Sequence, residues 1–327
     1  MSVTISAKDV SELRKSTGAG MMDCKEALKE SGGDLEGALD YLRKKGQKVA
    51  AKRADRDANE GVVVAMKNEA GDIGIIMALS CETDFVAKND NFIELANNIA
   101  KLVLEKLPET KDELLALEFD GASIAEKLIE QTGKIGEKIE VSEYAKLSGE
   151  NISTYIHAGS KIGVAVSHKG GTADESAQFF RGVAMHIAAM NPSILHPSEF
   201  DAELVAKETE SLIGQITIEN EDRKRLGKPL KNVPKYASKL QLTPEVMAQA
   251  EADIKAELAA EGKPEKIWDK IVPGKLDRFV ADNTLFDQDR CLLSQFFALD
   301  DSKTVEAAVK AFHDDAEILE FKRLAVG

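Results

Sequence analysis

The chain has 327 residues, of which 43% are hydrophobic and 31% charged, a balance that is typical of a globular protein and excludes an intrinsically disordered one. Its length predicts about two domains with a sizeable core. The net charge of −14 argues against nucleic acid or an anionic membrane as the main partner, because both require a basic surface.

The N-terminus lacks the apolar run of a signal peptide, and no stretch approaches the roughly 20 uninterrupted apolar residues of a membrane span. Three widely spaced cysteines, Cys24, Cys81 and Cys291, predict reduced and mostly buried thiols rather than a disulfide framework. We therefore expect a cytoplasmic protein.

The first 56 residues are expected to form a three-helix N-terminal module and a linker. Ser6 and Asp9 match a capping box, a second helix is expected over 21–31, and Asp34 is placed to cap a third. The buried stripe of this third helix is expected to comprise Leu35, Ala38, Leu39 and Leu42, with Gly46 as its end.

The linker, residues 43–56, is basic, with a net charge of +6. One interpretation is a solvated linker helix. The other is a patch that contacts an acidic or phosphate-bearing partner.

Two copies of a ββα pattern follow, and they predict a duplicated core of two sub-domains. Apolar runs over 62–66 and 73–79 predict a hairpin, and runs over 152–157 and 162–166 predict a second one. The helix after each hairpin has an inner face with the same spacing, first Phe92, Ala96, Ile99 and Ala100, then Phe180, Ala184, Ile187 and Ala188. We expect one core sub-domain over 57–140 and the other over 141–198 with 263–300.

Residues 199–262 are expected to form an inserted antiparallel helical hairpin of coiled-coil type. Apolar residues recur at helical spacing from Val205 to Ile216 and from Met247 to Leu258, while Pro229, Pro234 and Pro244 interrupt the chain between these helices. Residues 301–327 are expected to form a short C-terminal module, with a helix capped by Ser302 and a strand over 317–322. The predicted fold class is α+β.

Enzyme motifs are absent from the sequence. It contains no G-x-x-x-x-G-K-[ST], G-x-G-x-x-G or G-x-S-x-G pattern, and its five histidines show no metal-ligand spacing. A Cys81–His157 catalytic pair is conceivable, but Cys81 ends an apolar strand, where a thiol usually belongs to the core. We expect no catalytic residue, metal or cofactor.

Two apolar features lack a structural explanation from the pattern alone. Phe85 lies in a polar run that leaves a strand and enters a helix, so it either folds back onto the core or is presented beside Asp84 as an interface anchor. Met21 and Met22 are adjacent on a helix, so at least one of them should face the core. The pair is either two core methionines or an adaptable contact patch.

The sequence resembles the elongation factor Ts family, the guanine-nucleotide exchange factors for elongation factor Tu. The resemblance is carried by residues 13–28 and 83–89, with further matches over 157–164, 185–189, 262–267 and 301–305. The sequence departs from the family pattern over residues 214–243, which look like an insertion that lengthens the helical hairpin.

The resemblance implies a binding surface for elongation factor Tu and no covalent chemistry. The residues implied to contact Tu are Thr83, Asp84, Phe85, Val86, Met21, Met22, His157 and Gly159. Phe85, with Thr83, Asp84 and Val86, would reach the region of the Mg²⁺ bound beside GDP, and His157 would face another domain of Tu. Whether the free protein is a monomer or a homodimer stays open.

A second interpretation, from another class, is a non-catalytic scaffold or chaperone-like protein. The three-helix module is of the ubiquitin-associated-like type, which occurs in such proteins. This interpretation leaves residues 83–86 and the duplicated core without a role.

Overall fold

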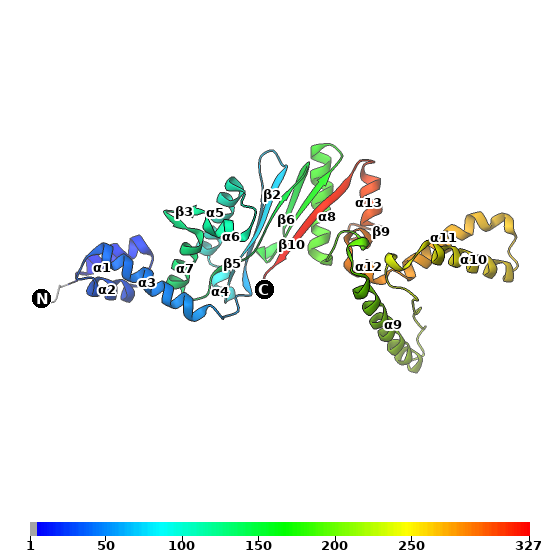
Figure 1. The fold of residues 1–327 in the computed structure, drawn as a ribbon, viewed down its shortest axis with the longest axis horizontal. Helices are drawn as coiled ribbons and strands as arrows, with labels where there is room; N and C mark the ends of the chain where they lie inside the picture. The colour runs from blue at the N-terminus through cyan, green and yellow to red at the C-terminus, as the bar shows by residue number, and fades with distance from the viewer. Residues whose placement is uncertain (1–4) are drawn as a thin grey trace. The chain divides into compact units, whose positions relative to one another are not determined.

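The computed structural model describes residues 5–327, so the first four residues of the predicted N-terminal module lie outside this description. The chain divides into two compact units, one running to Ala188 and including Ile318–Gly327, the other comprising Ala189–Glu317. Helices and antiparallel sheets are both present (Figure 1), which confirms the α+β class. No helix in 5–327 is both long and apolar enough to cross a bilayer.

Three helices open the first unit, and local capping explains where two of them begin. Ser6 and Asp9 form the predicted capping box, and the Asp34 carboxylate accepts the Gly37 N–H at 2.7 Å. These helices are α1 (Ala7–Thr17), α2 (Met21–Glu30) and α3 (Leu35–Arg53). Their shared core contains Val10, Leu13, Ala19, Cys24, Ala27, Leu28 and Ala38.

Two expectations for the third helix were wrong. Gly46 does not end α3, which continues to Arg53, because the helix packs there against α7 (Ile124–Ile135) and buries Gly46. Leu35 and Leu39 are not buried, since their side chains are 50% and 46% exposed. The predicted linker helix is therefore the second half of α3.

The first core sheet has the strand order β1-β2-β5, with both neighbouring pairs antiparallel. Its strands are β1 (Glu60–Lys67), β2 (Ile73–Cys81) and β5 (Glu140–Ser148). The pairing of β5 with β2 extends this sheet beyond residue 140, where the first sub-domain was expected to end.

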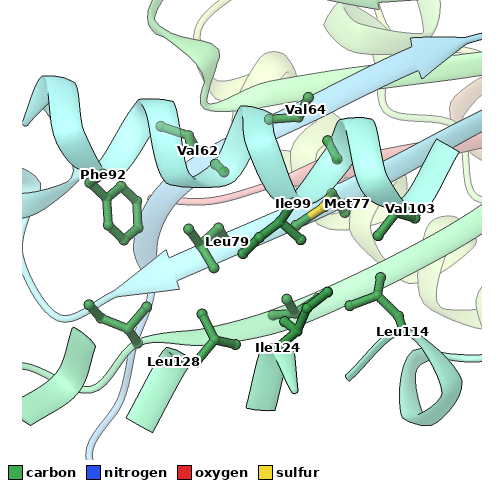
Figure 2. Close-up of a cluster of buried hydrophobic side chains, with 14 of the residues drawn as sticks. Val62, Val64, Met77, Leu79, Phe92, Ile99, Val103, Leu114, Ile124 and Leu128 are labelled. Carbon is green, nitrogen blue, oxygen red and sulfur yellow. The ribbon is translucent and has the colours of Figure 1, made fainter. Parts of the chain in front are cut away.

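Helices cover this sheet and close its core. They are α4 (Asp84–Ala87), α5 (Asp90–Lys106), α6 (Lys111–Ala116) and α7, with a small ladder of β3 (Glu118–Phe119) and β4 (Ala122–Ser123) between the last two. Figure 2 shows side chains from the strands and from α5 and α7 pointing toward one another. Phe92, Ala96, Ile99 and Ala100 are buried as their spacing predicted.

The second core sheet has the order β10-β7-β6. Its strands are β6 (Asn151–Ile156), β7 (Ile162–Lys169) and β10 (Glu317–Ala325), and α8 (Ala173–Met190) follows β7. The predicted inner face of this helix, Phe180, Ala184, Ile187 and Ala188, is buried. Because β10 belongs to this sheet, the expected C-terminal module over 301–327 is divided between the two units.

The second unit is largely helical. It contains α9 (Ala202–Arg225), α10 (Pro244–Ala260), α11 (Trp268–Asp282), α12 (Leu285–Arg290), the short β8 (Phe296–Phe297) and β9 (Asp300–Thr304), and α13 (Val305–Phe312). The cap of α13 is Thr304 rather than Ser302, since the Thr304 hydroxyl accepts the Ala307 N–H at 3.2 Å.

The helical hairpin differs from the predicted one. The helix α10 packs along α11 rather than along α9 (Figure 1), and Lys275 pairs with Glu257 across this contact at 2.6 Å. The segment 226–238, which is neither helix nor strand and contains prolines that prevent a helix, lies against α9. Asn220 of α9 both donates to the Lys231 carbonyl at 2.9 Å and accepts the Lys231 N–H at 2.8 Å.

Candidate partner-binding surface

The segment between β2 and α5 presents one large aromatic side chain to solvent. Residues 84–87 form the single turn α4, in which Ala87 is buried while the Phe85 side chain is 83% exposed. The interpretation in which Phe85 folds back onto the core is therefore wrong. An exposed phenylalanine on a turn that is anchored by a buried neighbour has the geometry of an interface anchor.

The start of this loop is fixed by two carboxylates. The Glu137 side chain accepts the Thr83 hydroxyl at 2.7 Å and the Thr83 N–H at 3.0 Å. The Glu82 side chain accepts the Lys138 N–H at 2.6 Å and pairs with Arg53 of α3, whose Nη1 lies 2.8 Å from both carboxylate oxygens. Although burial raises the pKa of Glu82, these hydrogen bonds and the Arg53 charge outweigh it and lower that pKa.

The remainder of the loop is charged and capped. Lys88 Nζ donates to Asp84 Oδ2 at 2.7 Å, and this hydrogen bond, which outweighs the opposing effect of burial, lowers the pKa of Asp84. Asn89 caps α5 by accepting the Asn91 N–H at 2.9 Å. Asp84 is therefore a carboxylate at neutral pH, one residue from the exposed ring of Phe85.

The second candidate loop contains His157 and Gly159. The 3-10 turn η1 (Ala158–Ser160) joins β6 to β7, and Gly159 has a φ of 81°, a left-handed conformation that glycine adopts without strain. His157 is exposed, with Nδ1 at 3.0 Å from the Tyr155 hydroxyl.

Both loops contact the same strand, β1. The Lys161 Nζ, directly after η1, lies 2.8 Å from Glu60 at the start of β1, and Glu60 pairs in the sheet with Cys81, which precedes α4 by three residues. The positive charge of Lys161 also contributes to the lowered pKa of Asp84. The sheet thus brings together two loops that are about 70 residues apart in the sequence.

Cys81 does not have the properties of a nucleophile. It is fully buried, its thiol donates to the Thr83 carbonyl at 3.2 Å, and burial, with the nearby Glu137 charge, raises its pKa to about 12. A thiol with this pKa is protonated at neutral pH, which agrees with the prediction of a core thiol. Within residues 5–327, no group of three or more His, Cys, Asp and Glu side chains could hold a metal ion.

The methionine pair lies at the start of α2, and neither side chain faces the core. Met21 and Met22 are 60% and 73% exposed, so the expectation that one of them must be buried was wrong. The helix buries Cys24, Ala27 and Leu28 instead. The two methionines therefore form an exposed, soft apolar patch.

Sequence reasoning missed the residues that hold the Phe85 loop. Glu82, Glu137 and Arg53 lie in polar runs, and their contacts join positions 29 to 56 residues apart. Hydrophobic periodicity carries no signal for such polar contacts.

Comparisons with known proteins show the family to which the chain belongs. A family model described as elongation factor TS matches residues 82–327. The chain is 66% identical over 325 residues to elongation factor Ts of Rhodopirellula baltica and 49% identical over 324 residues to that of Flavobacterium johnsoniae, covering 99% of each chain in both cases. It is 47% identical over 327 residues to elongation factor Ts of Streptococcus thermophilus, covering 99% of this chain and 92% of the relative. The chain belongs to the elongation factor Ts family of translation elongation factors.

Proposed function

We propose that this chain is a guanine-nucleotide exchange factor that binds elongation factor Tu in its GDP-bound or nucleotide-free form and promotes the release of GDP. Membership of the elongation factor Ts family supports this function. The observation that carries it is the exposure of Phe85, 83%, on a loop that is fixed at both ends.

In this function Phe85 enters the nucleotide-binding domain of Tu as an apolar anchor. A buried aromatic anchor commonly dominates the binding energy of an interface, and the adjacent Asp84 carboxylate fixes its register. Residues Thr83 to Val86 then lie close to the Mg²⁺ of Tu. Because this ion bridges the nucleotide phosphates and the phosphate-binding loop, its displacement weakens the hold of Tu on GDP.

The other two surfaces hold the partner in place. Met21 and Met22 are exposed and adaptable, which suits packing on a helix of Tu. His157 and Gly159 lie on a separate exposed turn and contact a second domain of Tu. Binding at separated points favours one orientation of Phe85 toward the nucleotide site.

Exchange then follows from thermodynamic linkage. If the factor weakens GDP binding to Tu, GDP weakens binding of the factor by the same ratio. A transient ternary complex loses GDP, and GTP later displaces the factor. No bond to a residue of this chain forms or breaks.

Release of a fluorescent GDP analogue from Tu tests the proposal. We expect the full-length chain to accelerate release, and we expect a large excess of free Mg²⁺ to oppose this acceleration, because the ion competes with its own displacement. Binding to Tu without acceleration would favour the scaffold interpretation, and acceleration that is insensitive to Mg²⁺ would contradict the displacement step.

A further inference from the structure

Two segments at the start of the Phe85 loop, Glu82–Thr83 and Glu137–Lys138, are joined by reciprocal hydrogen bonds. Glu82 reaches across to accept the Lys138 N–H at 2.6 Å, and Glu137 reaches back to accept the Thr83 N–H at 3.0 Å. Each carboxylate thus binds the backbone of the opposite segment. The two segments are 54 to 56 residues apart in the sequence, so this arrangement exists only in the folded chain.

Glu137 also determines the direction of the Thr83 side chain. The Thr83 hydroxyl donates to the second oxygen of Glu137 at 2.7 Å. Thr83 precedes α4 as its N-cap residue, yet its side chain makes no capping hydrogen bond to that helix. An N-cap hydroxyl ordinarily accepts a hydrogen bond from an N–H group of the first turn, but the Thr83 hydroxyl donates to Glu137 instead.

A helix of four residues cannot hold its own conformation. Isolated helices this short are unstable in water, because one turn fixes many dihedral angles for few hydrogen bonds. The orientation of α4 (Asp84–Ala87) must therefore come from contacts outside it. Those contacts include the burial of Ala87 at its end, the packing of Val86 against the core, and the bonds of Thr83 to Glu137 at its start.

The same cluster joins the loop to the N-terminal module. Arg53, at the end of α3, donates through Nη1 to both oxygens of Glu82 at 2.8 Å. The Glu82 side chain is 16% exposed, so the pair is better shielded from solvent than a typical surface ion pair.

We infer that Glu137 is a positioning residue, which sets the direction in which α4 presents Phe85 to a protein partner. This inference rests on the proposed function and names a residue that acts through Phe85 without touching the partner. A preset aromatic anchor binds more tightly than a mobile one, because less conformational freedom is lost when the complex forms.

The test compares Glu137→Gln with Glu140→Gln in the full-length chain. The first change keeps the size of the side chain but replaces one of its two acceptor oxygens with a donor group. The control removes a carboxylate that pairs with the Lys138 side chain at 2.9 Å and makes no bond to the loop. We expect Glu137→Gln to weaken binding to Tu roughly tenfold, the effect of losing one hydrogen bond to a charged group, and the control to change it by less than about twofold.

A double-mutant cycle separates positioning from a structural role. If Glu137 acts through Phe85, the effect of Glu137→Gln on the dissociation constant disappears in a Phe85→Ala background. An undiminished effect in that background would overturn the inference. If Glu137→Gln fails to fold, Glu137→Asp, which keeps the charge but draws the carboxylate back from Thr83, takes its place and should weaken binding in the same Phe85-dependent way.

Hydrogen exchange gives a readout that needs no Tu. The Ala87 N–H donates to the Thr83 carbonyl at 3.2 Å and the Lys88 N–H to the Asp84 carbonyl at 3.1 Å. We expect Glu137→Gln to speed exchange of these two amides and leave α5 unchanged, and unchanged exchange at both would overturn the inference. If the wild-type chain does not accelerate GDP release while this exchange result holds, the proposed function fails and the positioning of α4 stands.

Discussion

Gly46 and Gly133 are in direct backbone contact where α3 crosses α7. A Cβ atom built on Gly133 would lie 2.6 Å from the Cα atom of Gly46, a distance that real side chains do not tolerate. A Cβ atom on Gly46 would lie 3.7 Å from Gly133 Cα, which is ordinary van der Waals contact. The joint between the N-terminal helices and the core thus tolerates a side chain at one position but not at the other.

Substituting these two glycines should therefore have opposite effects. Gly133→Ala forces the helices apart and should lower the free energy of unfolding by about 1–3 kcal/mol. Gly46→Ala fits the available space and should raise it by roughly 0.5–1 kcal/mol, because alanine is the better helix former. Denaturant unfolding of both variants measures the difference. Equal destabilisation by the two changes would contradict the asymmetric contact.

Phe85 and Phe92 offer a matched pair of aromatic truncations. Phe85 is exposed, so Phe85→Ala should leave the melting temperature nearly unchanged but weaken binding to Tu by about 2 kcal/mol or more if it is the central anchor. Phe92 is buried in the core of Figure 2, so Phe92→Ala should lower stability by about 3–5 kcal/mol. Thermal unfolding and a binding isotherm separate the two results. Loss of stability in Phe85→Ala without loss of binding would reverse our assignment.

His168 should make the first unit sensitive to acid. Its ring lies buried in β7 and is stacked on Phe180 with centroids 3.7 Å apart. Its Nε2 lies 2.9 Å from the Ser153 hydroxyl, and its Nδ1 has no hydrogen-bond partner within residues 5–327. Burial first, and then the charge of Lys67, lowers its pKa from 6.5 to about 4.

The sign of the effect follows from proton binding. The unfolded chain takes up the His168 proton near pH 6.5 and the folded chain only near pH 4, so the free energy of unfolding falls as the pH decreases between these values. Over this whole pH range the protonation of His168 lowers the free energy of unfolding by about 3 kcal/mol. Denaturant unfolding from pH 7 to pH 5 should show a shallower pH slope for His168→Gln than for wild type. The exposed His157→Gln should keep the wild-type slope, and identical slopes for all three proteins would refute the prediction.

Asn220 should control the order of the segment 226–238 beside α9. Its amide makes two hydrogen bonds with the backbone of Lys231, so Asn220→Ala should free the chain there at a cost of about 1–2 kcal/mol in local stability. Limited trypsin digestion should cut after Lys231 several times faster than in wild type. The global melting temperature should not change, because Asn283 and Asp287 still hold the end of the segment through the Lys235 and Lys239 N–H groups at 2.9 and 2.7 Å.

A control on the same helix makes this test specific. Among residues 5–327, the Gln215 side chain hydrogen-bonds only the Ser211 hydroxyl, at 3.4 Å within α9. Gln215→Ala should leave the trypsin pattern unchanged. Equal cleavage of both variants would mean that Asn220 does not hold the segment.

Features that depend on neighbouring residues were predictable from the sequence. Ser6 and Asp34 cap their helices as expected, because a cap needs only its own side chain and the next N–H groups. The buried faces that begin with Phe92 and Phe180 were equally predictable, because helical spacing alone determines which side chains share a face.

Features that depend on distant contacts were not predictable. Gly46 has the propensity to end a helix, but packing against α7 outweighs it. The predicted pairing of α9 with α10 was wrong. Few large apolar residues specify that pairing, and α10 packs against α11 instead. The domain boundaries at residues 140 and 301 depended on strand pairings that no local pattern encodes.

The sequence by itself determined the α+β class, the capped helices, the buried thiols and the motifs that identify the family. It also placed Phe85 in a loop, but it left open whether the ring was buried or presented. The tertiary structure decided that question: the Phe85 ring is exposed, while Ala87 is buried, Val86 packs against the core and Glu137 accepts two hydrogen bonds from Thr83. The physical reason is that periodicity records which side chains share a face, whereas the direction of a single turn depends on polar contacts made across the fold.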